Sequence, residues 1–324
     1  NNGGVLFASE PKALFASGLL SPEVDEASVT AYLAHGYVPA PATLFKGVYK
    51  LPPAHLLIAK PSGDIHIERY WRAQPGTAPE NPKEELLALL EDSVHLQLRS
   101  DVPVGALLSG GIDSGLLVAL AARHAEVSLK TYTVRFQGAA YDESPLAAKV
   151  AERYGTHHTL IDVAAQDVAQ ALPRLAWHCD EPLFDASLLP NQMIEDVLGK
   201  EIRVALNGTG GDELFAGYGR YFPLPIESRY LKLPGFLRHG LVEPMASLLD
   251  PHLGFRLQRA QLFQEDPGSY LWAHSTQFPQ HFLKLIGHPR RLPSPAQSSF
   301  AAEWTGDTQA RLLWADINTY LSED

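Results

Sequence analysis

The sequence is poor in cysteine and has no long apolar run, and each scarcity excludes a class of protein. Cys179 is the only cysteine among 324 residues, so the chain cannot form an internal disulfide, and we expect a reducing, cytoplasmic setting. No apolar stretch approaches the roughly 20 residues that span a bilayer, and no signal-peptide pattern opens the sequence. We therefore expect no membrane partner.

Positive charge is also scarce. The chain has 26 Lys and Arg against 37 Asp and Glu, which gives a net charge of -11. This balance argues against nucleic acid as the main partner, because a nucleic-acid-binding surface concentrates positive charge. With 45% hydrophobic residues over its whole length, the chain can bury a sizeable core and is long enough for two domains or more.

Residues 1–75 combine β-prone runs with short helices. The runs at 56–59 and 65–67 flank a Pro-Ser-Gly-Asp tetrapeptide, which predicts a hairpin. Asp25 predicts the N-cap of the helix that follows it, and residues 5–8 predict the end of a strand.

From residue 76 onward, β-prone runs alternate with helical periodicity. This pattern is typical of a parallel sheet with helices on both faces, and the predicted fold class is therefore α/β. Past 226, apolar helical segments broken by proline replace the strands, so 226–324 is expected to be mainly helical. The strands are expected at 104–108, 130–136, 158–162 and 203–206, and the helices at 83–99, 115–124, 144–154, 168–179 and 192–199.

A glycine-rich loop follows the first of these strands and reads Ser109-Gly110-Gly111-Ile112-Asp113-Ser114. Glycine permits positive φ and close backbone approach, and the amino terminus of the next helix offers unpaired N–H groups to an anion. The two serine hydroxyls can donate to phosphate oxygens. Asp113 would repel bare phosphate, so its presence favours a magnesium ion beside the phosphates. The hexapeptide therefore favours pyrophosphate binding over an ordinary turn between strand and helix.

A second glycine motif, Asn-Gly-Thr-Gly-Gly-Asp-Glu-Leu-Phe, occupies 207–215 directly after the last expected strand. Because ligands of parallel sheets bind outside the carboxyl ends of the strands, both motifs are expected to face one crevice. Asp212 would then be able to share a metal ion with Asp113. Together the two motifs predict activation of a carboxylate by ATP.

Several segments resemble, in the same order, signature segments of the glutamine-dependent asparagine synthetases. Residues 100–114 look like that family's pyrophosphate loop, and 212–218 look like its second signature. The segment 141–155 is also similar, and 36–53 resembles the end of the family's glutaminase domain. The resemblance covers about 5–221 and, more faintly, 311–322.

The resemblance implies two domains and a carbon–nitrogen ligase of asparagine biosynthesis. Residues 1–75 would be the carboxyl-terminal remnant of a glutamine amidotransferase domain. Residues 76–324 would form an asparagine-synthetase-type ATP-pyrophosphatase domain with an adenine-nucleotide α-hydrolase-like sheet. In that family, ATP with Mg²⁺ activates the β-carboxylate of aspartate as an acyl adenylate with release of pyrophosphate. Ammonia from glutamine then displaces AMP to give asparagine. A homodimer is one possible oligomeric state of the protein.

The family's roles carry over to the residues in the matching motifs. The catalytic positions are Asp113, Asp212 and Thr209, and the two aspartates match the magnesium ligands. The ATP contacts implied are Leu107, Ser109, Gly110, Gly111, Asp113, Ser114, Val134, Asn207 and Gly208.

The chain departs from the family pattern at one motif position and at its ends. Thr209 stands where the family carries an acid, and a threonine is no base at neutral pH. The family's terminal cysteine nucleophile and a lysine-containing carboxyl-terminal stretch do not occur in the sequence, so we expect these residues alone not to hydrolyse glutamine. Two alternatives stay open: an amide ligase for a sugar, peptide or β-lactam precursor, and a catalytically impaired ATP-binding module.

Other polar residues have a structural and a functional interpretation. Cys179 is expected mid-helix as a buried structural thiol. The adjacent pair His157-His158 is a poor chelator, because neighbouring strand residues point to opposite faces. Asp142 and Glu143 start a helix. Two interpretations of these acids are evenly balanced: a structural role as N-cap and first-turn acids, and a functional role on the substrate side. Glu181 favours a structural turn over a substrate contact, and Arg220 favours packing and surface contact over an approach to a phosphate or carboxylate. Asp316 gives only a weak indication that it reaches the site.

Overall fold

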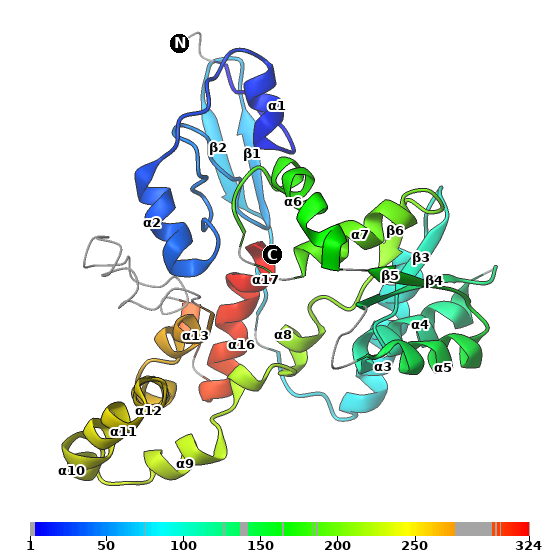
Figure 1. Cartoon of the computed structure of the whole chain (residues 1–324). Coiled ribbons are helices and arrows are strands. Elements are labelled where there is room, and N and C mark those ends of the chain that lie inside the picture. The colour runs from blue at the N-terminus through cyan, green and yellow to red at the C-terminus, as the bar shows by residue number, and fades with distance from the viewer. Residues whose placement is uncertain are drawn as a thin grey trace. The chain divides into compact units, whose positions relative to one another are not determined.

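A computed structural model of the chain describes residues 4–74, 76–125, 127–136, 142–163, 165–183, 185, 187–275, 300–301, 303–304 and 306–323 (Figure 1). The chain divides into two compact units, which we call the sheet unit and the terminal unit. The sheet unit comprises Ala73–Cys179 and Asp185–Thr209, and the terminal unit comprises Asn1–Arg72, Asp180–Phe184 and Gly210–Asp324. The domain boundary at 75/76 stays a prediction.

The described part of the sheet unit is built around a four-stranded parallel sheet with the order β5-β4-β3-β6. Its strands are β3 (Val104–Leu107), β4 (Lys130–Phe136), β5 (His157–Val163) and β6 (Val204–Leu206). Its helices are α3 (Pro82–Gln97), α4 (Ile112–His124), α5 (Ser144–Tyr154), α6 (Ala165–Cys179) and α7 (Leu188–Leu198). Every strand and helix expected for this region is therefore present, with ends shifted by a few residues.

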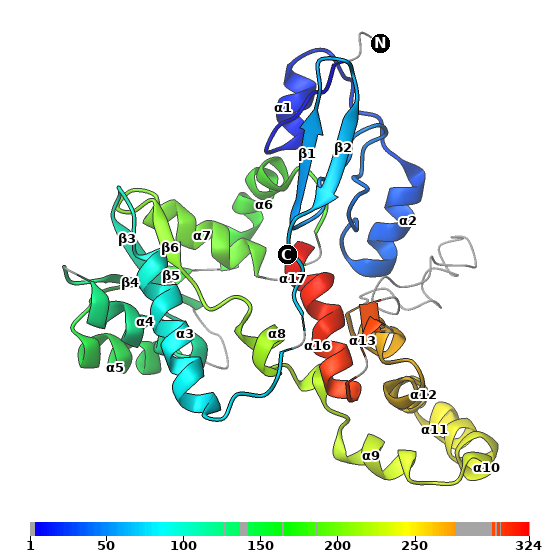
Figure 2. The same cartoon turned by 180° about the vertical axis from the view of Figure 1, so that it is seen from behind.

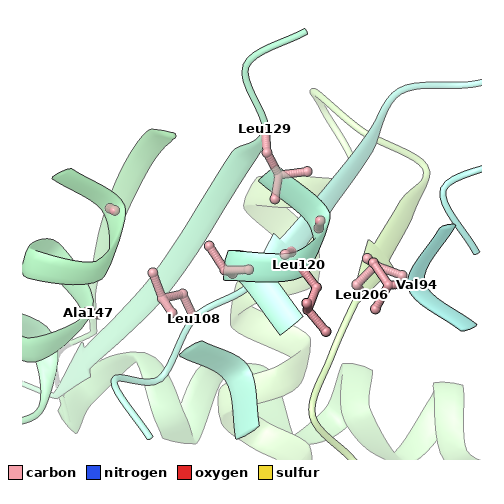
Figure 3. Packing of buried hydrophobic residues seen from close by; sticks show 10 residues of the cluster. Val94, Leu108, Leu120, Leu129, Ala147 and Leu206 are labelled. Carbon is pink, nitrogen blue, oxygen red and sulfur yellow. The ribbon is translucent and has the colours of Figure 1, made fainter. Parts of the chain in front are cut away.

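The sheet carries an apolar core on each face, as expected for a sheet covered on both sides. Ala106 and Leu108 pack into the larger core with residues of α3, α4 and α5 (Figure 3). Leu107 lies between them in sequence and packs instead on the opposite face, against the cluster that contains Ile194 and Leu198 of α7. This alternation follows from the two-residue period of a strand.

The strand order creates a point at which the chain changes direction across the sheet. From β3 the chain continues to β4 and then β5 on one side, and it returns to pair β6 with the other side of β3. The connections that leave β3 and β6 therefore diverge from adjacent strand ends. In open α/β sheets a ligand crevice forms outside the carboxyl ends of the strands at such a point.

The terminal unit begins with short helices and an antiparallel hairpin (Figure 2). The hairpin pairs β1 (His55–Ala59) with β2 (Ile65–Arg69), as predicted. The Asp25 side chain accepts from the Ala27 N–H at 3.3 Å and caps α2, so that prediction is also confirmed. The strand end expected at 5–8 is wrong, because these residues have no regular structure and Phe7 is 91% exposed.

The rest of the terminal unit is helical in the ranges that the structure describes, which agrees with the prediction for 226–324. No described helix has both the length and the apolar character needed to cross a membrane. A 3-10 turn lies at Gly219–Tyr221 and a π-helical turn at Arg238–Val242. The α-helices are α1 (Pro11–Ala16), α2 (Glu26–His35), α8 (Gly211–Phe215), α9 (Pro225–Leu231), α10 (Gly235–Leu237), α11 (Glu243–Leu249), α12 (Pro251–Glu265), α13 (Pro267–Ser275), α16 (Thr308–Asn318) and α17 (Tyr320–Glu323).

A buried ion pair lies in this helical part. Arg220 Nη2 lies 2.7 Å from Oδ2 of Asp316, whose side chain is only 1% exposed. The hydroxyl of Tyr221 donates to the same carboxylate oxygen at 2.5 Å. The rings of Tyr218 and Tyr320 have their centroids 4.3 Å and 4.6 Å from the guanidinium carbon. The aromatic rings thus enclose the cation, and Asp316 supplies its counter-charge.

We predict that Asp316→Asn lowers the free energy of unfolding by about 3 kcal/mol, because it leaves a buried guanidinium without its counter-charge. Urea denaturation measures the change. The double variant Arg220→Met/Asp316→Asn removes both charges and should recover most of the loss. Arg72→Met is the control, because the ion pair of Arg72 with Glu303 is exposed at 48% and 41%. A double variant no more stable than Asp316→Asn would contradict the assigned pairing.

Candidate functional site

The glycine loop that follows β3 has a backbone that only glycine fits. Gly110 has a φ of 88°, in the left-handed region that side chains disfavour. A Cβ placed there would lie 2.8 Å from the carbonyl oxygen of Glu143 and 3.2 Å from the Ala147 nitrogen. The loop therefore lies against the start of α5. This close approach explains the glycine at that position and fixes the loop on the sheet unit.

Hydroxyl groups of the loop bond to one another and to its backbone. The Ser109 and Ser114 hydroxyls lie 3.0 Å apart, and the Ser109 N–H donates to Ser114 Oγ at 3.2 Å. Ser109 Oγ also accepts from the Gly111 N–H at 3.3 Å. Ser114 is buried in the first turn of α4, whereas Ser109 and Gly111 are exposed. The loop thus presents a hydroxyl and backbone N–H groups beside a helix amino terminus, which is the donor set that binds phosphate.

The first half of the second motif lies beside this loop within the sheet unit. A Cβ on Gly208 would lie 3.2 Å from the Asp113 Cβ and 3.4 Å from the Ser114 nitrogen, so a larger residue would crowd the start of α4. Asn207 Oδ1 accepts from the Thr209 N–H at 3.1 Å, which stabilises the turn. The structure therefore places Gly208 beside Asp113 and Ser114, whereas the shared crevice of the two whole motifs stays a prediction.

A cavity of about 460 Å³ adjoins these strand ends in the sheet unit. Leu107 lies in its wall, and Val134 packs in the same apolar cluster as Leu107. Both side chains are among the ATP contacts that the family resemblance implies. The wall also contains Asn207 and Thr209 of the second motif. It is completed by residues that the sequence did not single out, from α7, from β6 and from the residue before β6: Asn191, Ile194, Glu195, Leu198, Arg203 and Val204. A cavity with an apolar wall and a polar rim is suited to a nucleoside.

Asp212 belongs to the terminal unit, where it lies in the first turn of the short helix α8. A Cβ on Gly217 would lie 1.7 Å from Asp212 Oδ1, so glycine is required where the carboxylate folds over the chain. Its neighbour Glu213 is 2% exposed and accepts a hydrogen bond from the Tyr218 hydroxyl. Because Asp113 and Asp212 lie in different units, their sharing of a metal ion stays a prediction.

Burial and hydrogen bonding shift the pKa of several groups that flank the motifs. Burial, reinforced by the bond to Glu213, raises the pKa of the Tyr218 hydroxyl. The hydroxyl therefore remains a proton donor at neutral pH. Burial also lowers the pKa of His158, which shares a 3.1 Å hydrogen bond with Thr131 between two strands. This partner supports a structural role for His158.

The remaining candidates have structural partners. Asp142 Oδ1 accepts from the Ser144 N–H at 2.9 Å, and hydrogen bonds from Ser144 lower the pKa of Asp142. This acid therefore holds the start of α5, whereas Tyr141 lies outside the described residues. Arg220 does approach a carboxylate, that of Asp316. Cys179 was expected mid-helix but is the last residue of α6 and is half-buried, because the chain turns at Asp180 with a φ of 58°.

The sequence reasoning did not anticipate the role of Glu181. A structural turn was favoured at Glu181 over a substrate contact, and the structure adds specific partners: the carboxylate accepts the Leu44 N–H and lies 3.6 Å from Lys50 Nζ. No local signal could have revealed this, because the bonded residues are 137 positions apart.

Two family models match the chain. One, described as asparagine synthase, covers residues 85–324, and the other, described as a glutamine amidotransferase domain, covers residues 1–71. The parallel sheet with an apolar core on each face defines an α/β protein. Because the first family model spans most of the sequence, the chain belongs to the asparagine synthase family.

Named proteins also match. Asparagine synthetase (glutamine-hydrolyzing) 1 of Bacillus subtilis is 34% identical over 249 residues, which are 76% of this chain and 39% of that protein. Asparagine synthetase (glutamine-hydrolyzing) 3 of the same organism is 31% identical over 69% of this chain and 39% of that protein. Amidase chyE of Penicillium rubens is 29% identical over 68% of this chain and 35% of that protein. The chain thus spans less than half the length of the curated relatives it matches.

We predict that Gly110→Ala destabilises the sheet unit by about 1 to 3 kcal/mol, because it combines positive φ with a backbone clash. Thermal unfolding measures the loss. Gly115→Ala is the matched control in the first turns of α4, since its added Cβ would meet only Val150 Cγ2 at 3.9 Å. Equal melting temperatures for the two variants would refute the strained loop geometry.

Proposed function

We propose that this chain is the synthase part of an ATP-dependent amide-forming ligase that activates a carboxylate as an acyl adenylate. The observation that carries the proposal is the glycine loop at the strand-order switch between β3 and β6. The loop, with its hydroxyl and N–H donors, follows β3, and Leu107 at the end of β3 lies in the wall of the cavity of about 460 Å³. The family membership supports ATP as the nucleotide.

The chain's own residues have separable roles in this proposal. The Ser109–Ser114 loop binds the pyrophosphate end of ATP through backbone N–H groups and the Ser109 and Ser114 hydroxyls. Leu107 and Val134 contact the adenine, and the backbone at Asn207 and Gly208 borders it. A carboxylate oxygen of the acceptor attacks the α-phosphorus, and pyrophosphate leaves. Ammonia then attacks the acyl carbon, and AMP leaves as the amide forms. Catalysis of this kind depends mainly on positioning the reactants.

The donor set of the loop fits a magnesium ion carried by the nucleotide. Mg²⁺ in phosphoryl-transfer sites uses one or two protein carboxylates together with phosphate oxygens, and Asp113 stands beside the donors of the loop. Within the described ranges no group of three or more His, Cys, Asp or Glu is placed to hold a metal by itself. We assign Asp113 and Asp212 as its ligands; bound there, the ion would neutralise phosphate charge.

Aspartate is the acceptor that we propose, with asparagine as the product. The names of the two Bacillus subtilis relatives support this choice. A different carboxylate is the second candidate, since Thr209 supplies no acid at the crevice and a relative is named amidase chyE. The ammonia source would be glutamine, as the amidotransferase match at residues 1–71 suggests.

The test of the proposal is pyrophosphate release by the full-length protein with ATP, magnesium and ammonia, measured against a panel of carboxylic acids. We expect aspartate to stimulate release and asparagine to accumulate in equal amounts. Stimulation by another acid alone would replace the acceptor. Binding of ATP without release for any acid would instead make the protein an ATP-binding module.

We predict that Asp113→Asn weakens magnesium-dependent ATP binding by about tenfold or more, because one charged ligand of the ion is lost. Titration calorimetry with and without magnesium measures the effect, which should vanish when magnesium is omitted. Asp92→Asn on the exposed side of α3 is the control for a general change of charge. An affinity unchanged by Asp113→Asn would argue against the metal assignment.

A further inference from the structure

Two adjacent acidic residues, Asp180 and Glu181, are flanked in sequence by the sheet unit but pack within the terminal unit. Asp180 and Glu181 follow α6 and precede α7, and both of those helices belong to the sheet unit. Nevertheless, Asp180–Phe184 is part of the compact body that contains Asn1–Arg72. A short segment from the region matched to asparagine synthase is thus anchored in the region matched to the glutamine amidotransferase domain.

Asp180 bonds to the first helix of that region at two points. Its Oδ2 accepts from the Lys12 backbone N–H at 3.0 Å, and its Oδ1 lies 3.2 Å from Lys12 Nζ. The side chains of Asp180 and Lys12 are only 9% and 18% exposed, so water screens this pair less than an ordinary surface pair. The left-handed φ of 58° turns Asp180 out of α6, a conformation that aspartate tolerates better than most residues.

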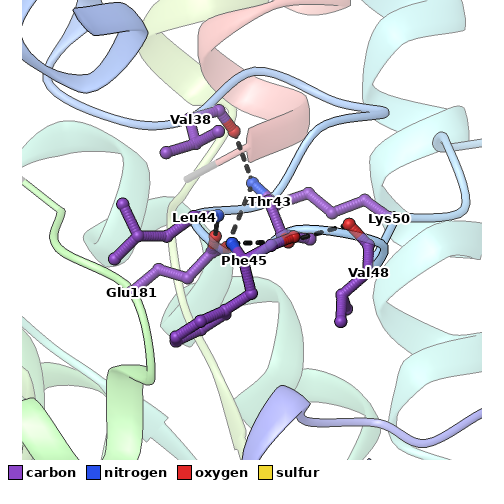
Figure 4. A network of polar contacts seen from close by, with 7 residues as sticks. All are labelled: Val38, Thr43, Leu44, Phe45, Val48, Lys50 and Glu181. Carbon is purple, nitrogen blue, oxygen red and sulfur yellow. Dashed lines mark hydrogen bonds and ion pairs between the residues drawn. The ribbon is translucent and has the colours of Figure 1, made fainter. Parts of the chain in front are cut away.

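Glu181 bonds to a second, separate stretch (Figure 4). One carboxylate oxygen accepts from the Leu44 N–H, and the other lies 3.6 Å from Lys50 Nζ. The same ammonium group donates to the Val38 carbonyl at 2.6 Å. The Thr43 hydroxyl bonds to carbonyl oxygens of the same loop, which gives Glu181 an ordered partner.

We propose that Asp180 and Glu181 are positioning residues that attach the amidotransferase-type segment to the synthase-type region and thereby couple ammonia supply to amide formation. The two contacts hold the Asp180–Glu181 segment to two different stretches of the terminal unit, α1 and the 43–50 loop. The attachment also lies on the connection between α6 and α7, and α7 contributes to the wall of the candidate nucleotide cavity. The coupling rests on the proposed function, whereas the attachment does not.

The experiment uses the full-length protein and three variants: Asp180→Asn, Glu181→Gln and their combination. Both changes remove charge but keep side-chain oxygens for the backbone N–H groups, and asparagine keeps the tolerance for positive φ. The matched control is Lys46→Gln, because its ion pair with Glu23 lies in the same region but is 52% and 68% exposed. Two readouts are needed, one for the attachment and one for the coupling.

Hydrogen exchange measures whether Asp180 and Glu181 hold the amidotransferase-type segment. In the combined variant we expect amides of residues 41–50 to exchange roughly tenfold faster, with α4 amides and the Lys46→Gln control unchanged. Unchanged exchange in 41–50 would overturn the attachment, whatever the enzyme does.

The coupling is measured by product formation, as the ratio of glutamine-supported to ammonia-supported amide synthesis. We expect this ratio to fall about tenfold in the combined variant while glutamate formation and ammonia-supported synthesis persist. An equal fall of glutamine-supported and ammonia-supported synthesis would indicate general destabilisation and would overturn the coupling. An unchanged ratio of the two activities, together with faster hydrogen exchange in 41–50, would also overturn it. If the wild-type protein forms no amide even from ammonia, the proposed function is refuted, and the proposed coupling is refuted with it. The hydrogen-exchange result then decides whether Asp180 and Glu181 attach the two regions.

Discussion

The parallel pairing of β3 with β4 on one side and β6 on the other is the interaction on which the candidate site depends. Ala106 lies opposite Thr131 of β4 and opposite Leu206 of β6, so the chain segments that leave β3 and β6 start side by side. A one-residue shift of either pairing would turn the alternating core residues to the wrong faces. The large apolar core therefore fixes the register, and the register fixes where the glycine loop and Gly208 meet.

Charge is used differently in the two units. In the sheet unit, Asp113 stands beside hydrogen-bond donors that suit an anion with its metal ion. In the terminal unit, Arg220 and Asp316 neutralise each other within an aromatic enclosure. Buried ions of the second kind can specify one packing arrangement even where apolar residues would be equally stable.

Much of the fold could be predicted from local sequence. The apolar runs at 104–108 and 130–136 are strands, and the glycine loop between strand and helix has the geometry that its residues require. Errors arose at element ends. The helix expected from 115 begins at Ile112, because Gly111 serves as its N-cap, and the run at 5–8 has no strand. Local propensity predicts that an element exists better than where it ends, because ends depend on caps and partners.

The sequence by itself determined the alternation of strands and helices, the two glycine motifs and the family, because these depend on residue order and short spacing. Only the tertiary structure decided that Glu181 bonds to the Leu44 region and that Tyr221 bonds to Asp316, a residue 95 positions away. It also showed α7 in the wall of the cavity beside Leu107. Contacts between distant positions form only when the whole chain packs, and they leave no periodicity in either partner's local sequence.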